Sequence, residues 1–515
     1  MRANGRTAAI LIVALTGAAC GAEQRTAEAP ASGAGSRDPV AEGPLDLAIA
    51  GGRVMDPESG LDAVRHVGVR DGSVAVISET PLDAAETIDA DGLVVAPGFI
   101  DLHAHGQDPA SNRFQAMDGV TTALELEIGA FPVDRWYRRR GGASLINYGV
   151  TVSHQGARRW ATGSVFARSN DDGTFSLGES GDDTLYRAVT ADEQARLDEL
   201  MERGLRDGGL GFGFGLSYTP GVTHDELLHL FEVAADHGVP SFVHLRSSGD
   251  FVRGGTLAPF QEVIANAAVT GAALHIVHLN SSAGSSAEAA VAMVRGARER
   301  GVDVTMEAYP YTASASLIES PLYDSWEGRP ASAYQSLQWV ETGERLTPET
   351  FARYRRQGGW VIGHGRSEEL NAWIVAQPDV IAASDGIPFS EGRSHPRGAG
   401  TFARILGHYS RDEGALSLMD ALRKMTLLPA QRLEPTAPAM SRKGRVQVGS
   451  DADLTIFDPE RIIDRATYEA PDRYSEGIAH VLVGGEFVVR DGVLLDDAAP
   501  GRPIMGRHLE SETPP

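Results

Sequence analysis

The sequence predicts an α/β fold: a (β/α)₈ TIM barrel with a small β-sandwich domain built from both terminal segments. Two observations lead to this prediction. Short apolar segments alternate with amphipathic stretches through residues 96–440, as a parallel barrel requires. Short strand patterns separated by glycine turns occupy residues 45–95 and 441–500, and neither segment is large enough to bury its own apolar face. We therefore expect the two terminal segments to meet in one small domain.

The N-terminal residues have the pattern of an export signal. Residues 1–20 contain a short basic segment, an apolar run and then small residues that end in Cys20. The apolar run is too short to span a bilayer. Small residues before a cysteine are typical of a bacterial lipoprotein signal, so we expect an exported protein of the periplasm or cell envelope with a lipid anchor on Cys20. A plain signal peptide with an incidental cysteine is the alternative. Residues 21–44 predict a flexible linker.

The barrel strands are predicted from eight short, mainly apolar runs. They cover residues 98–105, 120–127, 143–154, 209–217, 239–247, 273–281, 302–310 and 379–386. Amphipathic stretches that separate several of them predict helices. Residues 311–378 are too many for an ordinary connection, so we expect a lid over the strand ends there. Residues 501–515 are expected to form a tail.

The charge balance limits the class of partner. The formal net charge is −24. Nucleic acids and anionic membrane surfaces are bound through excess Lys and Arg, so neither is expected as the main partner. A small-molecule substrate is expected, with membrane contact only through the N-terminal anchor. The number of subunits stays open.

Histidines near the ends of predicted strands are the main sign of a functional site. His103 and His105 are two residues apart, so their side chains share one face of the first strand. His244 and His278 lie near the ends of later strands, and Asp385 ends the last one. The carboxyl ends of barrel strands surround the active site, so these side chains are expected to converge. Hydrogen-bonded core histidines are the alternative for any one pair.

Alternation along the later strands predicts the neighbours of these histidines. Arg246 shares a face with His244, and Asn280 shares a face with His278. The same alternation predicts that His275 points to the opposite face of its strand.

Glu125 and Glu127 place two carboxylates on one predicted core strand. A buried carboxylate is costly unless it is protonated, paired or bound to a metal. Imidazoles and carboxylates together are ligands of first-row metals, with Zn²⁺ the usual ion in histidine-rich sites. A two-metal site needs a bridging anion, and the chain has no lysine before Lys424 and no cysteine after Cys20. Glu127 is therefore the expected bridge, with Glu125 as its partner or substitute; pairing of both with arginines is the alternative.

This set of residues predicts a hydrolytic reaction. A bound metal lowers the pKa of its water and polarises a carbonyl oxygen. Asp385, next to that water, could accept its proton and pass it to a leaving nitrogen. We expect one or two Zn²⁺ ions, with other divalent metals left open, and hydrolysis of an amide or a related bond.

Longer motifs resemble a known family. The runs "APGFIDLHAH", "GVTTALE", "GFGLSYTPG", "HIVHLN", "EAYPYTAS", "ASDG" and "SHPRGAGTFARILGHYSRDEGALSLMDALRKMTLLPAQRL" extend through most of residues 45–495. They resemble the amidohydrolase superfamily, and more closely its N-acyl-D-amino acid deacylase (D-aminoacylase) branch.

The resemblance implies metal-binding roles for the four histidines. His103 and His105 would hold the more weakly occupied metal, and His244 and His278 the tighter one. Asp385 would be the general base and then the general acid.

The resemblance also implies substrate contacts. Tyr309 would polarise the scissile carbonyl, and Tyr218 would line the substrate pocket. Arg246 and Arg397 would bind the free carboxylate, because a guanidinium grips a carboxylate with two parallel hydrogen bonds. A structural salt bridge is the alternative for each arginine.

Two positions depart from the family pattern. D-aminoacylases carry Gly-Asn-Cys-Gly where this chain has Leu126, Glu127, Ile128 and Gly129, so Ile128 replaces their bridging cysteine. They also carry a substrate-binding lysine where this chain has Asn280. After the first change, a bridge between two metals would be made by carboxylate oxygen instead of sulfur. The second change removes the lysine that binds the N-acyl-D-amino acid in D-aminoacylases, so this substrate is in question.

The expected function is metal-dependent hydrolysis of N-acyl-(D-)amino acids. The first alternative is a dipeptidase or cyclic-amide hydrolase on the same barrel. Members of those branches often use a carboxylated lysine, which the barrel strands of this chain do not supply. A catalytically silent envelope binding protein is the alternative from another class. The acyl group, the amino acid side chain and the D or L preference stay open.

Overall fold

The computed structural model describes residues 43–168, 181–246 and 255–510. The expected signal peptide, Cys20 and nearly all of the linker lie outside these residues. None of the helices within the described ranges is long and apolar enough to cross a membrane.

Eight parallel strands form the barrel, which confirms the predicted fold class. They are β6 (Phe99–Asp101), β7 (Val120–Ala130), β8 (Asn147–Ser153), β9 (Phe212–Gly215), β10 (Ser241–His244), β11 (Leu274–Ile276), β12 (Val304–Ala308) and β16 (Val380–Ala382). Each strand overlaps one predicted run, and they pair in chain order, from β6 through β12 to β16. A parallel bridge between Ala104 and Gly386 joins the first and last strands just beyond their ends. The carboxyl ends therefore surround one opening.

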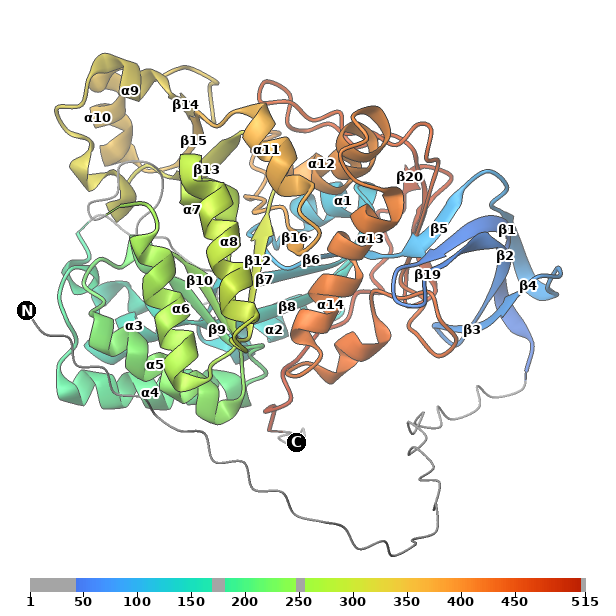
Figure 1. Cartoon of the computed structure of the whole chain (residues 1–515), viewed down its shortest axis with the longest axis horizontal. Helices are drawn as coiled ribbons and strands as arrows, with labels where there is room; N and C mark the ends of the chain where they lie inside the picture. Colours follow the sequence, from blue (N-terminus) through green and yellow to red (C-terminus); the bar gives the residue numbers. More distant parts are fainter. Residues whose placement is uncertain (1–42, 169–180, 247–254, 511–515) are drawn as a thin grey trace, which may run out of the picture. The chain divides into compact units, whose positions relative to one another are not determined.

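Helices surround these strands (Figure 1). They are α1 (Pro109–Met117), α2 (Val133–Arg140), α3 (His154–Thr162), α4 (Ala191–Arg206), α5 (His224–His237), α6 (Ala258–Thr270), α7 (Leu279–Ala283), α8 (Ala287–Arg298), α11 (Glu368–Val375), α12 (Arg397–Arg404), α13 (Leu418–Met425) and α14 (Leu427–Leu433). Local sequence sets their ends: Thr190 and Glu193 form a capping box at the start of α4, and Gly238 ends α5 in the left-handed conformation.

Shorter helical turns connect these elements. They are η1 (Val165–Arg168), η2 (Asp183–Leu185), η3 (Leu216–Tyr218), η4 (Gly284–Ser286), a π-helical segment η6 (Ile405–Asp412) and η7 (Pro438–Arg442).

The two terminal segments meet, as expected from their size, and they form one hydrogen-bonded sheet where a small sandwich was predicted. The N-terminal strands are β1 (Leu45–Asp56), β2 (Leu61–Arg70), β3 (Ser73–Ser78), β4 (Ala84–Asp89) and β5 (Val94–Pro97), and the C-terminal strands are β17 (Leu454–Phe457), β18 (Ile478–Val483), β19 (Glu486–Arg490) and β20 (Val493–Leu494). Strands β5 and β17 pair antiparallel, so the nine strands form one hydrogen-bonded network with its own apolar cluster. Figure 1 shows strands from both chain ends gathered there.

The predicted lid segment has its own structure. It contains a three-stranded antiparallel sheet of β13 (Ala313–Leu317), β14 (Leu337–Trp339) and β15 (Trp360–His364), with η5 (Pro321–Trp326), α9 (Ala331–Gln335) and α10 (Pro348–Gln357). Aromatic side chains, including Trp339 and Tyr354 with stacked rings, form a separate core for it. The last part of the segment is α11, which leads directly into β16.

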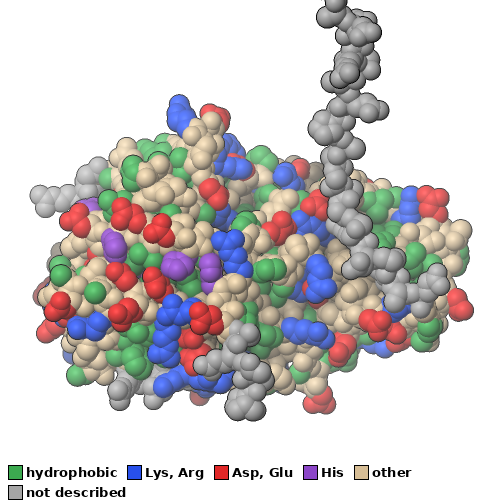
Figure 2. Space-filling model, turned by 90° about the horizontal axis from the view of Figure 1, so that it is seen from below, with side chains coloured by type: hydrophobic (Ala, Val, Ile, Leu, Met, Phe, Trp, Pro, Cys, Tyr) green, Lys and Arg blue, Asp and Glu red, His purple; other side chains and the backbone are tan. Residues whose placement is uncertain are grey.

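Basic and acidic side chains are interspersed on one face of the molecule. On the face shown in Figure 2, Lys and Arg side chains lie among Asp and Glu side chains rather than in one basic surface. This distribution agrees with the acidic composition of the chain.

Candidate metal centre

Two groups of buried ligand-type side chains share Glu127. One contains His103, His105, Glu127 and Asp385, and the other contains Glu127, His244 and His278. Within each group the ligand atoms lie within 4.8 Å of one another. The structure thus brings together the five predicted metal ligands and the predicted base, from β7, β10 and the segments that follow β6, β11 and β16.

Each oxygen of Glu127 faces a different histidine pair. Oε2 contacts His103 Nε2 and lies 3.3 Å from His105 Nε2. Oε1 lies 2.5 Å from His244 Nδ1 and 3.6 Å from His278 Nε2. Glu127 thus presents one oxygen to each histidine pair. This is the arrangement in which a carboxylate can bridge two cations.

A large bulge in β7 aims Glu127 at this point. Glu125 pairs with Val150 of β8, but the next paired residue, Ala130, is opposite Val152. The residues between them, including Glu127, therefore leave the regular ladder, as bulges do beside active sites. Gly129 has φ +68°, and a Cβ there would lie 2.6 Å from the Thr151 carbonyl oxygen, so the bulge requires glycine.

The spacing of the histidine nitrogens fits a metal. His103 Nε2 and His105 Nε2 are 3.2 Å apart, and His244 Nδ1 and His278 Nε2 are 2.9 Å apart. Nitrogens bound to one tetrahedral Zn²⁺ at 2.0–2.1 Å stand about 3.3 Å apart. His244 Nε2 is buried and has no hydrogen-bond partner among the described residues. The donor set and the spacing are those of first-row metal ligands.

Outer partners hold the histidine rings in place. Glu125 Oε2 is 2.7 Å from His105 Nδ1, and Glu307 Oε1 is 2.5 Å from His103 Nδ1. Ser281 and Ser282 hydroxyls contact His278 Nδ1 at 3.0 and 3.2 Å. Carboxylate and hydroxyl partners of this kind fix the tautomer and raise the basicity of a metal-binding imidazole. Glu125 therefore lies behind His105, in agreement with its predicted role as a partner.

Glu307 is a functional residue that the sequence analysis missed. It lies on β12, is fully buried, and its other oxygen is 3.0 Å from His275 Nε2. A buried acidic residue at the end of a predicted core strand was the available signal. The prediction that His275 faces away from the site is wrong, because alternation ends with β11 at Ile276. His278, at φ +31°, is the residue just before α7, and its side chain lies in the cluster.

The carboxylates change the pKa values of the histidines beside them. Burial alone would lower the pKa of His103, but Glu127, Asp385 and Glu307 raise it well above its ordinary value. Burial alone would also raise the pKa of Glu127, yet His103 and His244 hold it well below the ordinary range. The carboxylates give the cluster a negative charge that stabilises positive charge among them. A divalent cation would supply this positive charge.

Asp385 links the histidines to an arginine. It follows β16 at φ +52°, with Oδ1 3.3 Å from His105 Nε2 and Oδ2 2.8 Å from Arg397 Nη1. Burial alone would raise the pKa of Asp385, but Arg397 and His103 lower it below its ordinary value. The carboxylate is therefore ionised at neutral pH and placed to accept a proton.

Arg397 and Tyr309 form the second part of the site. Arg397 is 1% exposed, its guanidinium lies 4.6 Å from the Tyr309 ring centroid, and its Nε and Nη2 have no hydrogen-bond partner among the described residues. Arg366, which the sequence analysis did not single out, donates to the Tyr309 hydroxyl at 2.8 Å. Asn280 donates to the Tyr309 carbonyl oxygen at 2.9 Å. Two guanidinium groups thus meet one buried tyrosine.

The other two predicted substrate residues have different surroundings. The Tyr218 ring packs 4.8 Å from the His244 ring, and its hydroxyl is 3.4 Å from Ser316 Oγ. Arg246 is not brought to the cluster, because its guanidinium lies 2.9 Å from Glu262 and donates to the Val222 carbonyl. The salt-bridge alternative describes Arg246.

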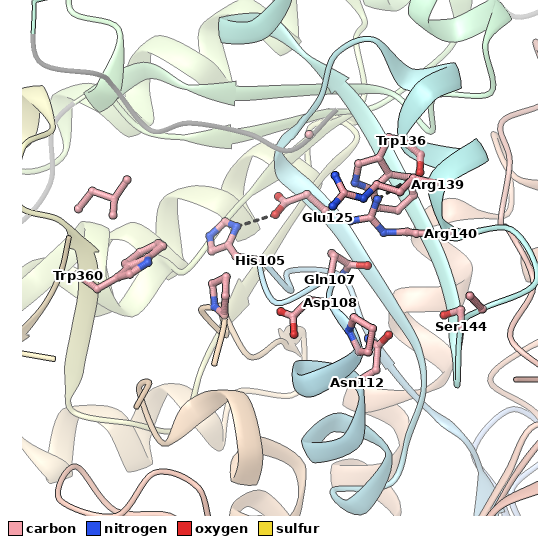
Figure 3. Close-up of a pocket in the computed structure, with 15 residues that line it drawn as sticks. His105, Gln107, Asp108, Asn112, Glu125, Trp136, Arg139, Arg140, Ser144 and Trp360 are labelled. Carbon is pink, nitrogen blue, oxygen red and sulfur yellow. Dashed lines mark hydrogen bonds and ion pairs between the residues drawn. The ribbon is translucent and has the colours of Figure 1, made fainter. Parts of the chain in front are cut away.

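A cavity of about 600 Å³ adjoins the cluster (Figure 3). His105, Glu125 and Gly129 form its wall toward the metal ligands, and Leu317 and Trp360 of the predicted lid segment form another part. Its volume is in the range of small-molecule sites.

Comparison with known proteins gives the family. The model of the Amidohydrolase family matches residues 86–147 and 170–489. An N-acyl-D-glutamate deacylase of Alcaligenes xylosoxydans xylosoxydans is 30% identical over 485 residues, covering 86% of this chain and 93% of that protein. A dihydroorotase of Anaeromyxobacter sp. (strain K) is 31% identical over 464 residues, covering 87% and 98%.

A solved structure agrees with this result. N-acyl-D-glutamate deacylase from Bordetella Bronchiseptica, complexed with zinc and a phosphonate inhibitor, has a TM-score of 0.75 and 28% identity, and the match covers 90% of this chain and 100% of that one. The family model, the relatives and the shared fold lead to one conclusion: the chain belongs to the amidohydrolase family.

Proposed function

We propose that this protein is a metal-dependent deacylase that hydrolyses N-acyl-D-amino acids to a carboxylic acid and a free amino acid. One observation carries the proposal: Asp385 has one oxygen on the histidine cluster and the other on the buried Arg397. A proton acceptor thus stands between a metal site and a group that binds carboxylates. The similar N-acyl-D-glutamate deacylases support the D configuration.

The metal would be held by the groups that share Glu127. His244, His278 and Glu127 form one set, and His103, His105 and Glu127, with Asp385 beside them, form the other. When bound, a divalent ion, with Zn²⁺ the first candidate, supplies a water of lowered pKa and polarises the substrate carbonyl. One or two ions are compatible with these ligands.

Asp385 would move the proton. Its depressed pKa keeps it ionised, so it can accept a proton from the attacking water. It would then deliver that proton to the amide nitrogen, which makes the amino group a better leaving group. Arg397 keeps the carboxylate oriented through the 2.8 Å contact.

Arg397 and Arg366 would bind the α-carboxylate of the substrate. Both guanidinium groups lie over Tyr309, at 4.6 and 5.1 Å from its ring centroid. Arg366 Nε and two nitrogens of Arg397 lack hydrogen-bond partners among the described residues. A bound carboxylate would satisfy them, and Arg366 would provide the positive charge that the family's lysine provides where this chain has Asn280.

A cyclic-amide hydrolase is the second candidate, and the identity with a dihydroorotase favours it. Against it, the barrel strands contain no lysine to carboxylate. We rank it below the deacylase.

Export and lipid attachment at Cys20 belong to the same proposal. The basic start, the short apolar run and the small residues before Cys20 support them. Replacing Cys20 by Ser should release the protein from the membrane fraction of expressing bacteria; unchanged membrane association would contradict the anchor.

The test is hydrolysis by the purified, zinc-loaded protein of matched N-acetyl-D- and N-acetyl-L-amino acids, dipeptides and dihydroorotate. We expect turnover of D substrates, reduced about 10²–10⁴-fold by Asp385→Asn, the range of general acid–base contributions. Dihydroorotate or dipeptide turnover without D-amino acid release would move the enzyme to the second candidate. Stoichiometric zinc without any turnover would favour a binding protein.

A further inference from the structure

The cavity beside the cluster has a cationic end. Figure 3 shows Trp136, Arg139 and Arg140 of α2 gathered on one side of it, with Glu125 between them and His105 in this view. The Arg140 guanidinium carbon lies 3.8 Å from the Trp136 ring centroid. Stacking on an indole holds this guanidinium in a fixed orientation within the cavity wall.

Arg140 lacks an acidic partner. It donates a hydrogen bond from Nη1 to the Trp136 carbonyl at 3.2 Å, and its buried Nε has no partner within the described part of the chain. Among the described residues, no carboxylate makes an ion pair with it. Burial lowers the pKa of Arg140 to about 10, and the neighbouring Arg139 adds to this effect, while Glu125 and Asp108 act on this pKa in the opposite direction without contacting the guanidinium. Arg140 is half-buried, but its Nε is buried without a partner in the described structure, and an anion in the cavity would satisfy this group.

The two carboxylates that line the same cavity already have partners. Glu125 binds His105 Nδ1 at 2.7 Å and accepts from the Ile128 amide. Asp108 caps α1 and accepts from the Ala110 and Ser111 amides at 2.9 and 3.0 Å. The unsatisfied polar group is therefore the guanidinium, and the cavity favours a negatively charged ligand.

The position of the cavity connects it to the reaction. It shares His105 and Glu125 with the cluster, whereas Arg397 meets Asp385 from α12 and does not line the cavity. A substrate held by its α-carboxylate at Arg397 would direct another substituent into the cavity. Besides Arg140, the cavity lining includes apolar residues such as Leu317 and Trp360.

We propose that the Arg140 cavity is a subsite for a second carboxylate of the substrate, so that the enzyme prefers N-acyl amino acids with two carboxylates. This inference rests on the proposed deacylase function. The second carboxylate has two sources: an acidic amino acid side chain, or the free end of a dicarboxylic acyl group. Both present the same chemistry to Arg140.

The experiment compares three substrates: N-acetyl-D-leucine, N-acetyl-D-glutamate and N-succinyl-D-leucine. We expect kcat/KM for at least one acidic substrate to exceed that for N-acetyl-D-leucine by about 10-fold or more, as for a charge-assisted hydrogen bond. The substrate that shows the preference identifies the source. Arg140→Gln should remove the preference, and Arg140→Lys should retain part of it.

Arg138→Gln is the matched control, because Arg138 is on the same helix but exposed and paired with Asp134. Its ratio of acidic to neutral kcat/KM should equal that of the wild type. An equal loss in Arg138→Gln, or no acidic preference in a protein that hydrolyses N-acetyl-D-leucine, would overturn the subsite and leave the deacylase proposal intact.

A binding measurement separates the two proposals if no substrate is hydrolysed. In an Asp385→Asn background, calorimetry should show N-succinyl-D-leucine or N-acetyl-D-glutamate binding about 10-fold or more tightly than N-acetyl-D-leucine. Arg140→Gln should remove this difference, with retained melting temperature as the check on folding. Equal affinities for all three ligands, or an acidic preference that survives in a folded Arg140→Gln variant, would contradict the subsite. If Arg140→Gln does not fold, Arg140→Lys decides: an unreduced preference overturns the proposal.

Discussion

The histidine cluster and the Arg397 region differ in how completely the protein satisfies their polar groups. In the cluster, Glu125 and Glu307 hold the outer nitrogens of His105 and His103. Around Tyr309, buried nitrogens of Arg397 and Arg366 have no partner among the described residues. The histidine rings are already held in the orientation that a cation would need, whereas the arginine nitrogens lack the anion that would satisfy them. Substitutions in the two regions should therefore affect different measured quantities.

Glu127→Ala should have the largest effect, because it removes the carboxylate shared by both ligand groups. We expect loss of bound zinc and a fall in kcat/KM of at least about 10³-fold, since a metal supplies several kcal/mol of transition-state stabilisation. Elemental analysis and turnover of an N-acetyl-D-amino acid measure both. Glu199→Ala, on the exposed side of α4, is the control and should keep full zinc and activity.

Arg397→Met should lower kcat/KM by about 10²–10³-fold while zinc content stays unchanged, because it removes a charge-assisted contact and the partner of Asp385. Arg246→Met is the matched comparison, since Arg246 pairs with Glu262 away from the cluster. If Arg246→Met caused the same loss, the assignment of the two arginines would be wrong.

Arg397→Met should also change how kcat/KM depends on pH. Arg397 and His103 hold the pKa of Asp385 below its ordinary value, so the base form persists as the pH falls and is lost only below that value. Without Arg397 this pKa rises, and the acidic limb of the kcat/KM profile should move to higher pH. An unmoved acidic limb would mean that Asp385 is not the titrating base.

Glu307→Gln should weaken zinc binding by about 10–100-fold, the usual effect of removing an outer partner of a metal-binding histidine. His103 would lose the acceptor that lies 2.5 Å from its Nδ1. Competition with a chelator measures the affinity. Unchanged affinity would show that Glu307 is only a structural partner of His275.

Arg366→Met should have the smallest effect, an increase in KM of about 10-fold with little change in kcat, because it removes one of two cations near the substrate carboxylate. An unchanged KM would leave Arg397 as sole carboxylate ligand. A change in zinc content would contradict the separation of the two regions.

The strands and the metal-type ligands could be predicted because they depend on local patterns. Apolar runs of strand length gave all eight barrel strands, and His103 and His105 could be found because they follow the first of these strands directly, at the end where barrel sites lie. Glu127 could be chosen because the chain has no lysine before Lys424 and no cysteine after Cys20, so the barrel strands offer neither for a bridge.

The remaining features depend on packing between distant segments. The Glu127 side chain is directed toward the histidines by a bulge in β7, and this bulge is seen only in the register of β7 against β8. His275 was misplaced because the strand ends at Ile276, which alternation does not show. Arg366 reaches Tyr309 from a segment 57 residues further along the chain, and no local pattern identifies such a contact.

The central claim is that amide hydrolysis occurs at a metal held around Glu127, and a metal titration tests it most directly. The protein is stripped with a chelator, Zn²⁺ is added in steps, and hydrolysis of N-acetyl-D-amino acids is measured at each step. Our account predicts no turnover without metal, recovery with the first one or two equivalents, and no recovery in Glu127→Ala. Equal turnover with and without metal would contradict it.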